Sequence, residues 1–286
     1  MIDLIATDLD GTLLQTNGDI SDGNREAIQY AQSKGIEVVV ATGRSFESAK
    51  RPLDRAGLNC PIICLNGANS YNKEGEQVLT IDMNKDLIQA IIQTVEKENA
   101  YLELYTNHGI YSKDLTDFKD VLINMLLSNH PEVSREEVEK RANQRFQEET
   151  FIFTEDLSSI LMDERVHIYK ALAFSIEADA LERIRRSLDG SDGLKMTSSG
   201  VDNIEFNHPE AQKGITLKKW IQPKSIDPKN VLAIGDNYND LSMLEWVGYS
   251  IAMDNADLAI KQKCFDTTAS NDEDGVKQAI YKYINN

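Results

Sequence analysis

Two aspartates, Asp8 and Asp10, stand one residue apart at the end of a short apolar run near the start of the chain. The run Leu4–Thr7 is typical of a buried β-strand, and at strand spacing both carboxylates point the same way. Carboxylates that close repel each other unless a cation or a shared proton separates them. The pattern therefore indicates a cation site, although Asp and Gly also favour solvated turns. These residues alone leave both readings open.

A second acidic cluster, Asp236 to Asp240, follows a second apolar run, Val231–Ile234. Its β-branched and aliphatic residues predict another buried strand. Asp236 can face Asp8 and Asp10 only if the two strands are neighbours. A doubly wound sheet allows this arrangement.

Strands and helices alternate in the first part of the chain. Helices are predicted over 21–34 and from a cap at Ser45 through 56, and strands over 4–8, 36–41 and 62–65. This alternation predicts an α/β fold, a doubly wound and mostly parallel Rossmann-like sheet. Ligands bind such sheets beyond the carboxyl ends of the strands, where Asp8, Asp10, Thr42 and Asn66 are expected.

The order of the predicted strands and helices changes between residues 83 and 208. Helices are predicted over 84–99, 114–128 and 134–147, a hairpin over 101–111, a strand over 166–175, a further helix from 178, and short strands near 194–198 and 202–206. Runs of strands separated by helices indicate an α+β unit. We therefore predict a core domain over 1–82 and 209–286 and an inserted α+β cap domain over 83–208.

Composition excludes several classes of function. The 286 residues are 41% hydrophobic and 27% charged, as in an ordinary globular protein, and the formal net charge of −17 disfavours nucleic acid and anionic membranes as partners. Three cysteines form no disulfide framework, and four scattered histidines show no zinc-ligand spacing. With no leader and no apolar run of membrane-spanning length, we expect a cytoplasmic protein without a membrane partner, a monomer or weak homo-oligomer.

Four motifs together resemble those of the haloacid dehalogenase-like hydrolases. They are Asp8-Leu9-Asp10-Gly11-Thr12, Thr42-Gly43-Arg44, Lys213-Gly214 and Gly235-Asp236-Asn237-Tyr238-Asn239-Asp240. The Ala-Thr-Gly-Arg form of the second motif and the large insert after it resemble the Cof-type phosphatase branch. The resemblance covers the whole chain, with motifs and insert in the expected order.

The resemblance implies a covalent mechanism with magnesium. Asp8 would be the nucleophile that takes the phosphoryl group as an aspartyl-phosphate, and Asp10 the general acid and then the base for water. The Asp8 side chain, the Asp10 backbone carbonyl and Asp236 would hold Mg²⁺. A hard cation with oxygen ligands suits an acidic cluster that contains no histidine.

The resemblance also implies a set of phosphate-binding groups. Thr42 and Gly43 would donate through a hydroxyl and a backbone N–H, and the backbone N–H of Leu9 would add a further donor. Lys213 would place a positive charge on the phosphate and the nucleophile. Asn239 resembles the family's phosphate contact after the metal ligand.

The roles of three further residues stay open. Asp240 resembles a supporting carboxylate behind the metal ligand. Arg44 is interpreted either as a functional residue or as the partner of a carboxylate. Asn66 is either functional or an ordinary turn residue.

The expected substrate is a small phosphorylated metabolite, and the insert would act as a cap that excludes water and contacts the leaving group. Cof-type enzymes are similar in acting on sugar phosphates, pyridoxal phosphate and flavin mononucleotide (FMN). Some that resemble this chain in size dephosphorylate 5-amino-6-(5-phospho-D-ribitylamino)uracil, an intermediate of riboflavin synthesis, which is our lead substrate. A phosphomutase and a non-catalytic magnesium- or phosphate-binding protein are the alternatives from other classes.

Overall fold

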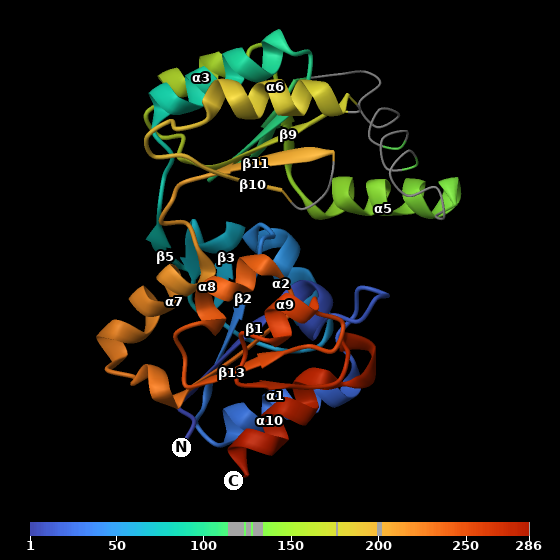
Figure 1. Cartoon of the computed structure of the whole chain (residues 1–286), viewed down its shortest axis with the longest axis vertical. Coiled ribbons are helices and arrows are strands. Elements are labelled where there is room, and N and C mark those ends of the chain that lie inside the picture. Colours follow the sequence, from blue (N-terminus) through green and yellow to red (C-terminus); the bar gives the residue numbers. More distant parts are fainter. Residues whose placement is uncertain (114–122, 124–126, 128–133, 176, 199–201, 286) are drawn as a thin grey trace. The chain divides into compact units, whose positions relative to one another are not determined.

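The computed structural model describes residues 1–113, 123, 127, 134–175, 177–198 and 202–285 (Figure 1). The chain divides into two compact units. Unit 1 comprises Met1–Thr80 and Glu210–Asn286, and unit 2 comprises Ile81–Pro209. The sequence predicts these boundaries at 82/83 and 208/209. Most of the helix expected over 114–128 lies outside the described residues.

Unit 1 is built on an eight-stranded sheet in the order β14-β13-β12-β1-β2-β3-β4-β5. The first six strands of that order pair in parallel and the last two are antiparallel additions. Their bounds are β1 Leu4–Asp8, β2 Glu37–Ala41, β3 Ile62–Cys64, β4 Asn69–Tyr71, β5 Gln77–Thr80, β12 Val231–Gly235, β13 Tyr249–Ala252 and β14 Asp266–Thr267. The predicted doubly wound, mostly parallel α/β sheet is confirmed.

Helices cover this sheet. They are α1 Asp22–Ser33, α2 Phe46–Arg55, α7 Lys213–Ile221, α8 Leu241–Leu244, α9 Leu258–Lys261 and α10 Gly275–Ile284. Every residue of β1 is buried, as expected for a central parallel strand covered on both faces. Leu217 of α7 and Met243 of α8 pack with Leu4 and Ala6 in one core cluster. Helices α1 and α10 lie side by side and contact β2 and β12 respectively (Figure 1).

Two helices start at capping serines, and the cap at Ser45 was predicted from the sequence. The Ser21 side chain accepts a hydrogen bond from the N–H of Asn24 at the start of α1, and the Ser45 side chain accepts one from Ser48 at the start of α2. Such bonds satisfy backbone donors that a helix leaves unpaired in its first turn. Ser45 thereby sets where the chain turns from the end of β2 into α2.

The strands β4 and β5 were not predicted. Their residues show neither a continuous apolar run nor a clean alternation, and β5 is mostly exposed at the sheet edge. Their pairing depends on the neighbouring strand β3 rather than on local pattern. A short edge strand of this kind limits pairing with other chains.

Unit 2 is an α+β unit with a six-stranded sheet in the order β10-β11-β9-β6-β7-β8. Its strands are β6 Tyr101–Thr106, β7 Gly109–Ser112, β8 Phe151–Phe153, β9 Ile168–Phe174, β10 Lys195–Thr197 and β11 Asn203–Asn207, and its helices are α3 Lys85–Lys97, α5 Arg135–Glu148 and α6 Ala178–Leu188. Helices α3 and α6 pack beside each other (Figure 1). The core contains Ile88, Ile184 and Phe206. In the described part of the chain no helix combines the length and apolarity needed to cross a membrane.

We predict that Gly214→Ala destabilises unit 1 strongly. A methyl group at this position would lie 1.7 Å from the backbone oxygen of Ser242, so α7 and α8 could not keep their close approach. Overpacking against backbone typically costs about 1–3 kcal/mol or more. Chemical denaturation measures the decrease in the free energy of unfolding.

Gly57→Ala is the matched control, because Gly57 has a positive φ of 65° but no atom within 4 Å of the added methyl. The free energy of unfolding of this variant should fall by only about 1 kcal/mol, because alanine is disfavoured in the left-handed backbone conformation. Equal losses in the two variants would contradict the close-packing account.

Candidate active site

The carboxyl ends of four neighbouring strands bring the predicted motifs together. The strands β12, β1, β2 and β3 are adjacent and parallel. Asp8 ends β1, Asp236 follows β12, Thr42 follows β2, and the turn Leu65–Gly67 follows β3. Parallel strands place their carboxyl ends at one edge of the sheet, where α/β proteins bind ligands.

A buried lysine links two of the carboxylates. Lys213 is the first residue of α7 and is 1% exposed. Its Nζ donates to Asp8 Oδ1 at 2.6 Å and to Asp240 Oδ1 at 2.7 Å. A buried ammonium requires such partners, because an unpaired charge in the interior is strongly unfavourable.

Asp240 uses both of its side-chain oxygens. While Oδ1 receives Lys213, Oδ2 accepts the backbone N–H groups of Asp236 and Asn237, each at 3.0 Å. This carboxylate therefore orients the loop that carries Asp236. It behaves as the supporting group that the resemblance implied.

Asp236 lies against the first motif. Thr12 Oγ1 donates to Asp236 Oδ1 at 2.9 Å. Gly11 has a φ of 75°, and a Cβ at Gly11 would lie 2.4 Å from Asp236 Oδ2. Only glycine satisfies both the left-handed backbone and the contact with the carboxylate. Asn255 Nδ2 donates to the carbonyl of Gly11 at 2.8 Å and fixes this loop from the other side.

The burial of these charges shifts their pKa values. Desolvation, with the nearby Asp240 carboxylate, raises the pKa of Asp8 well above its usual range and that of Asp236 to about 6. Burial alone would lower the pKa of Lys213. The carboxylates of Asp240 and Asp8 outweigh this effect and raise the pKa, so the lysine stays charged. Three carboxylates thus share one lysine, and their burial and mutual repulsion disfavour the state in which all three are ionised.

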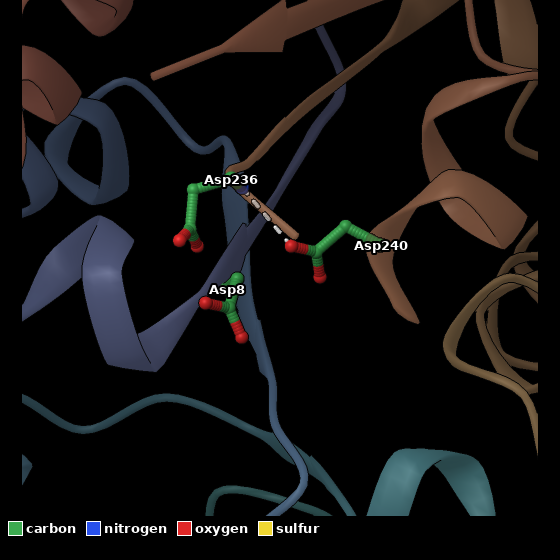
Figure 2. A group of neighbouring side chains, drawn as sticks. All are labelled: Asp8, Asp236 and Asp240. Carbon is green, nitrogen blue, oxygen red and sulfur yellow. Dashed lines mark hydrogen bonds between the residues drawn. The ribbon is translucent and has the colours of Figure 1, made fainter. Parts of the chain in front are cut away.

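The chemistry of this cluster fits a divalent cation. Oxygens of Asp8, Asp236 and Asp240 lie within 4.8 Å of one another. Figure 2 shows the three side chains converging, Asp8 and Asp236 from the ends of β1 and β12 and Asp240 from the helical turn after β12. Because Asp240 is committed to Lys213 and two N–H groups, Asp8 and Asp236 are the side chains suited to coordinate an ion. Oxygen ligands favour Mg²⁺ or Ca²⁺, and a cation would reverse the pKa shifts caused by repulsion.

Asp10 lies outside this cluster and is paired with an arginine. Arg44 donates through Nε and through a second guanidinium nitrogen to both carboxylate oxygens of Asp10, at 2.6–3.1 Å. The Asp10 side chain is 53% exposed, whereas Asp8 is buried. One of the two interpretations of Arg44, that it pairs with a carboxylate, matches this contact.

Three of the expected phosphate-binding groups lie on two loops, Thr42 and Gly43 after β2 and Asn239 after β12, and Asn66 contacts both loops. Thr42 is fully buried and its Oγ1 accepts the Arg44 N–H at 3.1 Å, which leaves its hydroxyl hydrogen to donate. Asn239 Nδ2 donates to Asn66 Oδ1 at 3.1 Å. The side chain of Asn66 also packs beside Gly43, since a Cβ on Gly43 would lie 3.2 Å from its Oδ1.

Comparison with known proteins shows the family of this chain. The model of the haloacid dehalogenase-like hydrolases matches residues 5–280. The chain belongs to the haloacid dehalogenase-like hydrolase family. It is similar to the phosphatase YwpJ of Bacillus subtilis, at 32% identity over 96% of each chain. It is also similar to the 5-amino-6-(5-phospho-D-ribitylamino)uracil phosphatase YwtE of the same organism, at 35% identity over 96% of each chain.

A solved structure supports the same assignment. A haloacid dehalogenase-like hydrolase from Bacillus subtilis superposes with a TM-score of 0.86 at 32% identity, over 99% of this chain and all of that one. The family and its named relatives make this chain a phosphatase of the Cof type, a phosphoric monoester hydrolase.

Two residues of the site were missed by sequence reasoning. Thr12 belongs to the first motif, but no role was predicted for it. Its position just after the acidic pair could have suggested that its hydroxyl contacts a further carboxylate. Asn255 follows the strand β13 in a run, Asp254-Asn255-Ala256, that carries only an ordinary turn signal. Its contact with Gly11 spans 244 positions and leaves no local pattern.

We predict that Asp236→Asn stabilises the metal-free protein at neutral pH. The folded-state pKa of about 6 exceeds the ordinary 3.8, so the ionised form is disfavoured by folding. This penalty is absent below pH 3.8, grows between pH 3.8 and 6, and is complete above pH 6. The gain should be about 1–3 kcal/mol at pH 7, and it should vanish near pH 4.

Urea denaturation with chelator at several pH values measures this difference. Added Mg²⁺ should stabilise the unmodified chain but not Asp236→Asn, because a ligand that binds only the folded state raises its stability. A variant that is less stable than the unmodified chain without metal, or equally stabilised by Mg²⁺, would contradict the account.

Proposed function

We propose that this phosphatase hydrolyses a small phosphorylated metabolite through an aspartyl-phosphate on Asp8, with Mg²⁺ as cofactor. The observation that carries the proposal is the bonding of Lys213 to both Asp8 and Asp240, beside Asp236. This contact fixes one Asp8 oxygen and leaves the other to act as nucleophile or metal ligand. A positioned carboxylate with a cation beside it is suited to covalent phosphoryl transfer.

In this proposal the groups divide the steps of the reaction among them. Asp8 attacks phosphorus, and Asp10 protonates the leaving alcohol and then takes a proton from water. The negative charge on the phosphoryl oxygens is stabilised by five groups: Lys213, the Leu9 and Gly43 N–H groups, Thr42 and Asn239. Arg44 holds the Asp10 carboxylate by two-point contact before substrate arrives.

The proposed magnesium site consists of Asp8, Asp236 and the backbone carbonyl of Asp10. Bound there, Mg²⁺ would supply charge neutralisation between the anionic nucleophile and the phosphate. It would also offset the desolvation and repulsion that raise the pKa of Asp8 in its absence. Asp8 is then held in the ionised form that nucleophilic attack requires.

We propose 5-amino-6-(5-phospho-D-ribitylamino)uracil as the lead substrate, in riboflavin synthesis. The similar YwtE protein is named for this activity and aligns over 96% of the chain. The alternative is a broad-specificity phosphatase for sugar phosphates, FMN or pyridoxal phosphate, as the Cof-type resemblance implies. Unit 2 is proposed to be the cap that selects among these leaving groups.

Phosphate release from a panel of these compounds tests the assignment, with Mg²⁺ and with chelator. We expect chelator-sensitive release and a strong preference, by at least about 10-fold in kcat/KM, for the ribitylamino-uracil phosphate. Comparable rates on several compounds would favour the broad-specificity alternative. No release from any of them by the folded, magnesium-binding protein would favour a phosphomutase or a binding role.

We predict that Asp8→Asn lowers kcat by at least about 10³-fold, because the amide is not a nucleophile while its shape is unchanged. Steady-state phosphate release and circular dichroism measure activity and fold. Asp3→Asn, just before the opposite end of the same strand, is the matched control and should keep normal activity. Substantial turnover by Asp8→Asn, with an unchanged fold, would overturn the assignment of Asp8.

A further inference from the structure

The turn after β3 has an unusual backbone conformation. Leu65, Asn66 and Gly67 all have positive φ, at 48°, 57° and 106°. The left-handed region is unfavourable for leucine and tolerated by asparagine. Such a backbone persists only where its surroundings over-determine it, and functional sites are where such turns gather.

Backbone hydrogen bonds tie this turn to the Thr42–Arg44 loop. The N–H of Leu65 donates to the carbonyl of Arg44, and the N–H of Asn66 donates to the carbonyl of Thr42, each at 2.9 Å. The two loops therefore keep one fixed relation. The carboxamide of Asn66 is thereby held beside Gly43.

The same turn is tied to α7. Thr216 Oγ1 donates to the carbonyl of Gly67 at 2.7 Å, and a Cβ on Gly67 would lie 2.6 Å from the carbonyl oxygen of Gln212. Helix α7 begins at the next residue, Lys213. The turn thus connects the loop after β2 with the helix that carries the buried lysine.

The side chain of Asn66 makes a third connection, to Asn239. A primary amide has two N–H donors and one carbonyl acceptor. One N–H of Asn239 donates to Asn66 Oδ1 at 3.1 Å. With the Asn239 nitrogen turned toward Asn66, its second N–H is left to donate elsewhere.

We propose that Asn66 is a positioning residue for phosphate binding. Its carboxamide orients Asn239 so that the second N–H of Asn239 meets a phosphoryl oxygen, and its left-handed backbone holds Gly43 and Thr42 at the same oxygens. Asn66 acts through these neighbours and takes no part in bond making. This inference rests on the proposed phosphatase function and adds a residue to its phosphate-binding machinery.

The sharpest test is Asn66→Gly, because glycine keeps the left-handed backbone at no steric cost and removes only the carboxamide. We expect the thermal midpoint to stay equal or rise. We expect the dissociation constant for inorganic phosphate, measured by calorimetry with Mg²⁺, to rise about 3- to 10-fold, the loss typical of one hydrogen bond. KM should rise by a similar factor, with a smaller change in kcat.

Asn99→Gly is the matched control. Asn99 also has a positive φ, at 51°, but follows helix α3 in unit 2. Its substitution should change neither phosphate affinity nor KM. Comparing the two variants separates the effect of losing the Asn66 carboxamide from the general effect of replacing an asparagine that has a left-handed backbone.

A double-mutant cycle with Asn239→Ala tests whether Asn66 acts through Asn239. If it does, Asn66→Gly should have little further effect on phosphate affinity once the Asn239 amide is absent. Fully additive losses, unchanged phosphate affinity in Asn66→Gly, or a loss that parallels a lowered thermal midpoint would each overturn the inference. Failure of the unmodified chain to bind or release phosphate would instead overturn the proposed function.

Discussion

The structure depends on burying one ammonium group between two carboxylates. Lys213 lies at the start of α7 and reaches Asp8 at the end of β1 and Asp240 in the helical turn that follows β12. Removing one partner from a buried ion pair typically costs about 3–5 kcal/mol, because the remaining charge loses its compensation. The contact therefore requires β1 and β12 to be neighbours, and it requires α7 to approach α8 as closely as Gly214 allows.

This arrangement carries an electrostatic cost that does not serve stability. Three aspartates share a small space with a single lysine, and desolvation by burial, together with carboxylate repulsion, raises the pKa values of Asp8 and Asp236. A core assembled only for stability would exclude that charge. Sites that destabilise the folded protein locally and are relieved by a ligand are characteristic of active sites. Two residues after Asp8, the Asp10 carboxylate is held by a two-point contact with Arg44.

The fold and the motif positions were predictable because they leave local signals. Apolar runs followed by polar residues marked β1, β2, β3 and β12, and Ser21 and Ser45 marked two helix starts. The contacts of Asn255 and Asn66 were not predictable, since each joins residues far apart in the chain through a side chain with an ordinary turn preference. The edge strands β4 and β5 were missed for the same reason. Pairing that a neighbouring strand imposes has no pattern of its own.

The most direct test of the central claim is chemical trapping of the phosphorylated residue. The protein would be mixed with Mg²⁺ and its preferred phosphate ester, quenched in acid within a turnover, and reduced with borohydride, which converts an aspartyl-phosphate to homoserine. Mass spectrometry of the N-terminal peptide should then show homoserine at Asp8, and the quenched Asp8→Asn variant should show none. Turnover with no modified residue at Asp8, or with the modification on another carboxylate, would contradict the account.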